Sequence, residues 1–336
     1  MPPPPSSRSV TLHDVARAAG VSLITASRAL SNPSVVSQAT IEKVREAVQT
    51  TGYIPNLLAG GLKARRSMTV AFLVPVISVP QFLPTVQALT VTLDEAGYQL
   101  ILGQTGYDRA RENALLNTMV SRRVDGIVVA GLLGADAEID QLKRLGVPVV
   151  ETWDLSDRPL DMVAGFSHLK VGSAVAGFFL ARGWRRLGIA TADDQRAMQR
   201  AAGFAAAIGH DVPTAVVPAP STVQAGRRAL GELLARDPHI EAIHCSSDGL
   251  ADGVLIEARA RGIDVPGRLA VCGFGDAEFA AHLEPSLTTV QVDGARIGRI
   301  AAAMILERCR GQMPEERVVD VGFRIVERGS TGAGRQ

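Results

Sequence analysis

Hydrophobic positions follow two different periods along the chain, and the change between them divides it. Between residues 11 and 54 the apolar positions recur at helical spacing, with almost no β-branched runs. From Thr69 onward, short continuous apolar strands alternate with Ala- and Leu-rich stretches of helical spacing. Continuous apolar strands separated by helices of about 10 to 15 residues are typical of βαβ units, whose parallel sheets are covered on both faces. The sequence therefore predicts an α/β protein with a small all-α head.

The expected elements are too many for one sheet. Strands are expected at 69–75, 98–102, 125–130, 147–150, 187–190, 242–245, 269–274 and around 317–326. Helices are expected at 84–96, 110–121, 137–145, 169–182, 196–208, 223–235, 249–261 and 294–309. With a boundary at 163–167, two doubly wound lobes result, the first over about 69–164 and 287–312 and the second over about 165–286 and 313–328. Two such lobes place a ligand cleft beyond the carboxyl ends of their strands.

The all-α head contains two short helices separated by a glycine. Gly20 supplies the positive φ of a tight turn, and Ser22 is suited to cap the second helix. A third helix over 38–50 completes a small core. Several side chains of the second helix are left facing outward, namely Leu23, Ile24, Thr25, Ser27 and Arg28.

These outward side chains suit DNA. Leu23 and Ile24, exposed at the start of a helix, favour contacts with thymine methyl groups in the major groove. Arg28 can pair with a guanine edge or hold a phosphate. Short hydroxyls commonly contact phosphates, and those available are Thr11, Ser22, Thr25 and Ser27. The alternative for this stretch is an αα-hairpin used for protein contact.

Charge is unevenly distributed. Residues 1–66 carry eight Lys and Arg against three Asp and Glu, a balance of +5, whereas the whole chain has a formal net charge of +1. A basic head on a mildly acidic body suits binding to a polyanion, although a chance cluster on a solvated face gives the same count. No window approaches the roughly 18 uninterrupted apolar residues of a membrane span. We therefore expect a cytoplasmic protein without membrane contact.

Two motifs decide between these alternatives. Residues 10–28 are Val-Thr-Leu-His-Asp-Val-Ala-Arg-Ala-Ala-Gly-Val-Ser-Leu-Ile-Thr-Ala-Ser-Arg, and residues 52–56 are Gly-Tyr-Ile-Pro-Asn. The chain resembles the lactose repressor (LacI) family of bacterial transcription regulators from Val10 to about Arg328. The resemblance implies a helix-turn-helix DNA-binding domain over 10–55, a hinge helix over 56–68 and, over 69–328, a two-lobed core like that of periplasmic binding proteins.

In this family the hinge helix forms on operator DNA and a leucine from each subunit kinks the duplex in the minor groove. Leu62 holds that position, Ala59 lies one turn before it, and Tyr53 and Asn56 belong to the preceding DNA-binding motif. The resemblance implies a homodimer on a palindromic operator. Whether the dimer goes on to form a tetramer stays open.

The resemblance also implies an effector site. Arg200 matches the arginine that reaches the ligand in this family. Ser247 and Asp248 match an Asn-Asp pair at the family's cleft, and Asp276 matches the second of two adjacent acids. Gly275 replaces the first acid, and a site that keeps the arginine and loses this carboxylate suits an anionic ligand.

The particular effector is expected from three short segments. Residues 151–154, 165–168 and 245–248 look most like the gluconate-repressor branch of the family. We therefore expect D-gluconate or a related sugar acid, with Trp153 and Asp154 in the site and Phe82 lining the opposite lip. Both aromatic residues could equally belong to the core. An effector that strengthens operator binding, such as a neutral sugar or a purine, is the alternative.

Other classes of protein fit less well. No catalytic or phosphate-binding motif is complete, since Glu278 stands where a dinucleotide fingerprint requires its third glycine. The six histidines and three cysteines lack metal-ligand spacing, so no metal, cofactor or catalytic residue is expected. A transport solute-binding protein would carry a signal peptide and no basic head. The chain ends, 1–9 and 329–336, are expected to be disordered and flexible.

Overall fold

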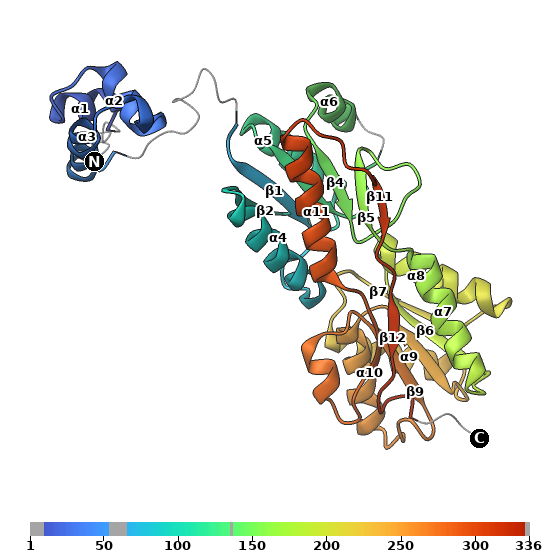
Figure 1. Cartoon of the computed structure of the whole chain (residues 1–336). Coiled ribbons are helices and arrows are strands. Elements are labelled where there is room, and N and C mark those ends of the chain that lie inside the picture. Colours follow the sequence, from blue (N-terminus) through green and yellow to red (C-terminus); the bar gives the residue numbers. More distant parts are fainter. Residues whose placement is uncertain (1–9, 54–65, 135–136, 333–336) are drawn as a thin grey trace, which may run out of the picture. The chain divides into compact units, whose positions relative to one another are not determined.

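The structure, a computed structural model, describes residues 10–53, 66–134 and 137–332. They belong to two compact units, a head that ends at Ser67 and a core that begins at Met68 (Figure 1). Each unit is described by itself. The hinge segment 56–65 and the chain ends 1–9 and 333–336 lie outside the described residues.

The head is a bundle of three helices, α1 (Leu12–Ala18), α2 (Leu23–Ser31) and α3 (Gln38–Thr51), with a single 3-10 turn at Pro33–Val35. As predicted, Gly20 between the first two helices has φ +64°, which a residue with a Cβ rarely adopts. The Ser22 hydroxyl accepts a hydrogen bond from the Thr25 backbone N–H at 3.1 Å and so caps α2. Small and branched side chains from all three helices fill the core, with Val15, Ala26 and Val44 fully buried.

The core contains two six-stranded sheets. The first is parallel throughout, in the spatial order β11 (Val318–Asp320), β5 (Met162–Gly165), β4 (Val149–Thr152), β3 (Gly126–Ala130), β1 (Thr69–Val74) and β2 (Gln99–Gln104). The second has the order β12 (Arg324–Val326), β10 (Thr288–Gln291), β9 (Ala270–Phe274), β8 (Ala242–Cys245), β6 (Leu187–Ala192) and β7 (Thr214–Val217). In this sheet only the pairing of β12 with β10 is antiparallel among the described residues.

Helices connect the strands of both sheets and bury their apolar faces. The first lobe holds α4 (Leu83–Glu95), α5 (Arg109–Ser121), α6 (Ala137–Leu145) and α11 (Gly294–Cys309). The second lobe holds α7 (His168–Ala181), α8 (Gln195–Ile208), α9 (Val223–Arg236) and α10 (Asp248–Ala260). Short 3-10 turns lie at Pro80–Phe82 and Glu278–His282. Figure 1 shows α11 beside α4, and Gly298 permits this approach because a Cβ there would lie 2.6 Å from the Thr85 carbonyl oxygen.

The lobe boundaries differ from the expected ones. Residues 288–291 form β10 in the second sheet, so the chain returns to the first lobe only with α11. The single strand expected around 317–326 is two short strands, β11 in the first sheet and β12 in the second. The expected divisions at 287 and 312 were therefore wrong. The reason is that strand pairing, which a periodicity does not record, decides the sheet to which a short β-branched run belongs.

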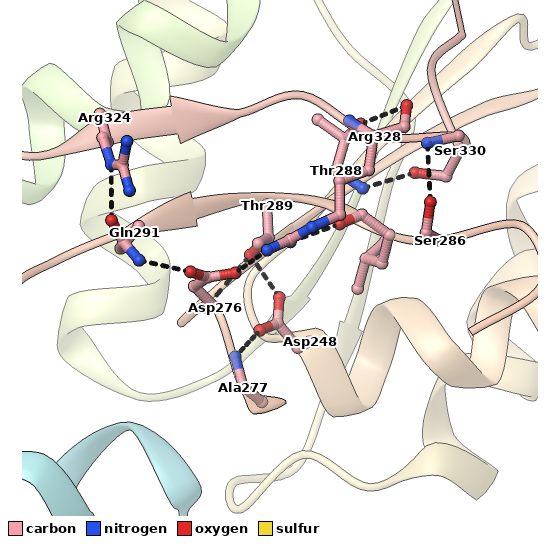
Figure 2. A network of polar contacts seen from close by, with 12 residues as sticks. Asp248, Asp276, Ala277, Ser286, Thr288, Thr289, Gln291, Arg324, Arg328 and Ser330 are labelled. Atoms are coloured by element: carbon pink, nitrogen blue, oxygen red, sulfur yellow. Dashed lines mark hydrogen bonds and ion pairs between the residues drawn. The ribbon is translucent and has the colours of Figure 1, made fainter. Parts of the chain in front are cut away.

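Residues 329–332 are not a flexible tail, contrary to expectation. Ser330 and Thr331 are buried, and the Ser330 hydroxyl donates to the Val271 carbonyl oxygen at 2.6 Å. The same hydroxyl oxygen accepts from the Thr288 backbone N–H at 2.8 Å (Figure 2). These hydrogen bonds fasten the segment to β9 and β10, and Gly- and Ser-rich composition gave no sign of them.

Candidate functional site

The second helix of the head presents an exposed apolar and polar surface. Leu23 is 37% exposed and Ile24 64% exposed, and Ser22 and Arg28 are also exposed. Thr25 and Ser27 are half-buried, with the Thr25 hydroxyl 2.8 Å from that of Ser22. The side chains predicted to face outward from α2 thus differ in exposure, and Ile24 in the first turn is the most exposed of those with a stated value.

Thr11 is exposed, but its hydrogen-bonding groups already have a partner. The hydroxyl and backbone N–H of Thr11 both donate to Oδ2 of Asp14, at 2.7 and 2.9 Å. Tyr53 is half-buried and packs against the core of the head. Asn56, Ala59 and Leu62 lie outside the described residues.

A cavity of about 240 Å³ lies between the two lobes of the core. The first lobe contributes the segment 78–81 after β1, together with Tyr107 and Trp153. The second lobe contributes the carboxyl ends of its strands and the helix starts that follow them, including Asp194, Arg196, Arg200, Ser246, Ser247, Asp248 and Phe274. This is the position at which ligands bind in doubly wound folds. Of the predicted effector residues, the cavity brings together Trp153, Arg200, Ser247 and Asp248.

Arg200 is the buried cation of this cavity. Its Nη1 lies 2.8 Å from Nδ1 of His168, and its Nη2 donates to the Ser246 carbonyl oxygen at 2.8 Å. The ring of Phe274 lies 4.0 Å from the guanidinium carbon. The Nε of Arg200 is buried and has no hydrogen-bond partner among the described residues. Burial lowers the pKa of Arg200 to about 10, so the group remains charged at neutral pH.

Asp248, at the start of α10, is a buried acid with both oxygens occupied. Oδ1 accepts from the Thr289 hydroxyl at 2.5 Å, and Oδ2 accepts from the Ala277 backbone N–H at 2.7 Å (Figure 2). Burial raises the pKa of Asp248 to about 6, although these hydrogen bonds oppose the shift. Because this pKa lies close to neutral pH, a small change in the surroundings of the Asp248 carboxyl group alters its charge.

Asp276 does not line the cavity, which corrects the prediction for this residue. Its carboxylate pairs with Arg328 at 2.7 Å and accepts from the Gln291 amide at 2.6 Å, and Arg324 donates to the other end of that amide (Figure 2). Asp276 has a positive φ of 50°, and its side chain turns toward Arg328, β10 and the segment after β12.

Phe82 also lies outside the cavity lining. Its buried ring contacts the ring of Trp153 edge-on, with centroids 5.1 Å apart, and so helps to fix the position of Trp153. The Trp153 indole N–H donates to the Thr85 hydroxyl at 3.0 Å, which fixes the ring at the cavity wall. The expectation that Phe82 forms a lip was wrong because its side chain completes the apolar core.

Asp154 lines a neighbouring hollow of about 470 Å³ and not the cavity itself. Tyr107, Asp194 and Arg196 line both spaces. Burial raises the pKa of Asp154, whose Oδ1 accepts from the Leu155 backbone N–H at 2.8 Å.

Several cavity residues were missed by sequence reasoning. Arg196 lies one helical turn before Arg200 on α8, and this i, i+4 spacing was the available signal. Its Nη1 donates to the Ala130 carbonyl oxygen of β3 at 3.0 Å, which joins the two lobes. Gln81, Tyr107 and Asp194 follow strand ends or precede helices, and nothing in their local sequence distinguished them.

Gly275 has a backbone conformation that few other residues adopt, with φ +129°. A Cβ at this position would lie 3.3 Å from Oε1 of Gln81 and 3.5 Å from Oδ2 of Asp248. The acid of the family pattern is therefore replaced by a glycine whose backbone conformation disfavours any side chain, with Gln81 and Asp248 close to where a Cβ would lie.

The arrangement can bind a small ligand reversibly. Two arginines and two aspartates line the cavity, and no cluster of metal-ligating side chains occurs in the described residues. The same chain carries a three-helix head with a helix-turn-helix geometry. A ligand-binding core joined to such a head defines a DNA-binding regulator that responds to a small molecule.

Comparison with known proteins identifies the family. Residues 11–56 match the model of bacterial regulatory proteins of the lacI family, and residues 176–331 match the periplasmic binding protein-like domain. The chain is 34% identical over 330 residues to the HTH-type transcriptional regulator GntR of Pseudomonas aeruginosa, covering 96% of this chain and 95% of the relative. The chain belongs to the LacI family of transcription regulators, as its motifs predicted.

Solved structures agree with this assignment. A LacI-family regulator from Silicibacter pomeroyi is 32% identical, with a TM-score of 0.90 over 96% of this chain and 99% of that one. The transcription regulator GntR from Chromobacterium violaceum is 37% identical, with a TM-score of 0.75 over 78% of this chain and 99% of that one. The lac repressor dimer bound to operator, at 22% identity and a TM-score of 0.81, shows the shared fold.

The family settles the broad function. Its members bind operator DNA and small-molecule effectors and act as dimers. This protein is a DNA-binding transcription regulator and not an enzyme, because its relatives are named as regulators and share its DNA-binding domain. Among the described residues, no helix is long and apolar enough to cross a membrane.

Proposed function

We propose that the protein is a repressor that leaves a palindromic operator when a small sugar acid, of which D-gluconate is the first candidate, binds between its lobes. It acts in the cytoplasm as a homodimer. The observation that carries the effector class is Arg200, a buried cation at the cavity whose Nε has no partner among the described residues. A carboxylate that accepts from this N–H gains a charge-assisted hydrogen bond in a site of low dielectric constant.

The surroundings of Arg200 support an anionic ligand. Asp248 already uses both carboxylate oxygens on protein donors, and Asp276 is neutralised by Arg328 outside the cavity. Gly275 brings no acid to the ligand. Arg196 is a second cation in the lining, so a carboxylate placed between the two arginines has positive groups beside it, although Asp194 and Asp248 also line the cavity. The remaining acceptors and hydroxyls, Asp194, Ser221 and Ser247, suit the hydroxyl groups of a sugar acid.

The size of the cavity supports a compact effector. Its volume of about 240 Å³ lies below the roughly 300–1,000 Å³ typical of sites for drug-sized ligands. The Trp153 ring at the wall offers an apolar surface for the carbon face of a sugar. A six-carbon sugar acid is compact, carries a carboxylate for the arginines, and has hydroxyl groups and a carbon face for the remaining lining.

The head supports the operator half of the proposal. Ile24 and Leu23 are held outward at the first turn of α2, where a recognition helix meets base edges. Ser22, Thr25 and Ser27 supply hydroxyls for phosphates, and Arg28 supplies a cation at the exposed surface. We propose that α2 enters the major groove of each half-site.

Effector binding lowers operator affinity through the relative position of the lobes. A ligand that contacts residues of both lobes favours one arrangement of them over another, and only this difference in affinity shifts the equilibrium. A coupling free energy of about 1–3 kcal/mol gives a 5- to 150-fold change in operator affinity.

Fluorescence anisotropy of the full chain on DNA from upstream of its own gene, at fixed salt, tests the proposal. We expect tight binding that D-gluconate reverses and that D-glucitol, a neutral polyol of the same length, does not. The Arg200→Lys variant should bind the operator and respond to gluconate only at higher concentration. Release by the neutral polyol, or tighter binding with gluconate, would contradict the sugar-acid inducer. If this DNA binds no better than random DNA, the operator is obtained by selection from random sequences and the titration is repeated.

A further inference from the structure

The side chain of His168 lies where the chain crosses from the first lobe to the second. It is the first residue of α7 and follows β5, which ends at Gly165 in the first sheet. The ring is buried against the rings of Phe166 and Phe274, with centroids at 4.6 and 6.1 Å. A polar ring in apolar surroundings needs partners for its nitrogens, and both nitrogens of His168 have one.

The two partners determine where the proton of this ring lies. Nε2 is 2.9 Å from the Trp153 carbonyl oxygen, which can only accept, so Nε2 carries the hydrogen. Nδ1 is 2.8 Å from Nη1 of Arg200, which can only donate, so Nδ1 is the acceptor. Burial, together with the charges of Arg200 and Arg196, lowers the pKa of His168 well below its usual value. The ring is therefore the neutral Nε2–H tautomer.

A continuous hydrogen-bonded path thus joins the lobes. It runs from the Trp153 carbonyl, at the end of β4 in the first lobe, through His168 to the Arg200 guanidinium and on to the Ser246 carbonyl in the second. Both terminal nitrogens of Arg200 have a fixed acceptor, and the Phe274 ring lies against the guanidinium plane. Of the five N–H groups of the guanidinium, these contacts use one at each terminal nitrogen, and the buried Nε has no partner among the described residues.

We propose that His168 is a positioning residue that holds Arg200 in place for the anionic group of the effector and ties its orientation to the Trp153 carbonyl of the first lobe. The part of this inference that concerns an anionic effector rests on the proposed function. Because the imidazole is rigid, a shift of the Trp153 carbonyl turns the ring and moves the acceptor offered to Arg200. The affinity of the site for an anion then depends on the arrangement of the two lobes, and the side chain of His168 provides this dependence.

Replacing His168 by Phe keeps an aromatic ring among the same neighbours and removes both hydrogen bonds. The matched control is His244→Phe, a ring buried in the same lobe and stacked on Phe204 with no hydrogen bond to Arg200. Gluconate binding is followed by tryptophan fluorescence, since Trp153 lines the cavity. Operator binding without effector is followed by anisotropy, and folding by thermal unfolding.

We expect His168→Phe to weaken gluconate binding about tenfold or more, the loss typical of a hydrogen bond to a charged group. The loss of gluconate affinity should exceed any change in operator affinity without effector, and His244→Phe should change neither quantity. In an Arg200→Lys background the added effect of His168→Phe should be much smaller, because residues that act as a unit are not additive. Equal losses from the two histidine variants, or full additivity, would overturn the inference.

A second measurement needs no effector. Nitrogen-15 spectra of the histidine rings in the ligand-free full chain, assigned with His168→Phe, should show His168 as the neutral Nε2–H tautomer at pH 7. Its Nδ1 resonance should move in the Arg200→Lys variant, while that of His244 should not. If the His168 ring carries its proton on Nδ1, or carries two protons, the inference is wrong. If gluconate has no effect but the tautomer and its shift are as expected, the effector proposal fails and the positioning role stands.

Discussion

The proposal that the cavity binds an anion makes a specific prediction for a single residue, Gly275. The backbone at Gly275 has φ +129°, and the space where a Cβ would lie is bordered by Gln81 and Asp248. A side chain here costs about 1–3 kcal/mol in backbone strain before its chemistry matters. A carboxylate here would also stand near Asp248 and repel an anionic ligand.

Restoring the acid therefore tests the ligand class at the residue scale. We expect Gly275→Asp to abolish gluconate release of the operator, and Gly275→Ala to retain a weakened response, at least tenfold stronger than that of the Asp variant. Ala introduces the strain and Asp adds the charge, so the difference between them measures the charge. Equal responses from the two variants would mean that the cavity does not hold an anion.

At the scale of elements, the start of α2 combines a local cap with exposed apolar side chains. Ser22 caps the helix, so Leu23 and Ile24 are held outward without support from the core. An exposed isoleucine contributes little to folding, because truncating it removes almost no buried surface. Its 64% exposure therefore suits a binding role.

Ile24→Ala should weaken operator binding by on the order of 1 kcal/mol, about fivefold, because part of the side chain is buried against DNA. The midpoint of thermal unfolding should stay unchanged. Val35→Ala is the control, since Val35 is 62% exposed in the same unit but lies in the 3-10 turn after α2. Anisotropy at one salt concentration measures both variants, and equal losses would argue against α2 as the recognition element.

At the scale of the whole molecule, buried ionisable groups link folding to pH. His244 is fully buried, and burial lowers its pKa to about 3. In the unfolded chain this pKa is near 6.5, so the unfolded state takes up a proton first as pH falls. The stability from His244 is fully present above pH 6.5 and is lost as pH falls toward 3. Asp248, with its pKa raised to about 6, acts oppositely, adding stability as pH falls toward 4.

We expect His244→Phe to flatten the acid side of this profile. Between pH 7 and pH 5 the wild-type core should lose about 2 kcal/mol more stability than the variant, the free energy of protonating one unfolded histidine. Urea unfolding monitored by tryptophan fluorescence at the two pH values gives the comparison, since Trp153 and Trp184 both belong to the core. Identical pH dependence in both proteins would place the acid sensitivity elsewhere.

The sequence by itself predicted the elements whose signals are local. The turn at Gly20, the cap at Ser22 and most strands and helices of the core follow from φ preference, side-chain hydrogen bonding and periodicity, which act over a few residues. The short strands β5, β7 and β10 were not expected. The motifs of the head likewise identified the family, because a recognition helix needs its outward side chains at fixed spacing. Arg200 was predicted in the same way, through a short matching motif, and it lines the cavity.

Only the tertiary structure decided the rest. It placed β10 in the second lobe and fastened Ser330 to β9, because strand pairing joins residues far apart in the chain. It turned Asp276 toward Arg328 and packed Phe82 against Trp153, since a partly buried charge is stabilised by an oppositely charged partner and an apolar ring by burial in the core. It also brought His168 against Arg200, 32 residues away. Composition and spacing do not encode such contacts, because the meeting of two side chains depends on how whole elements pack.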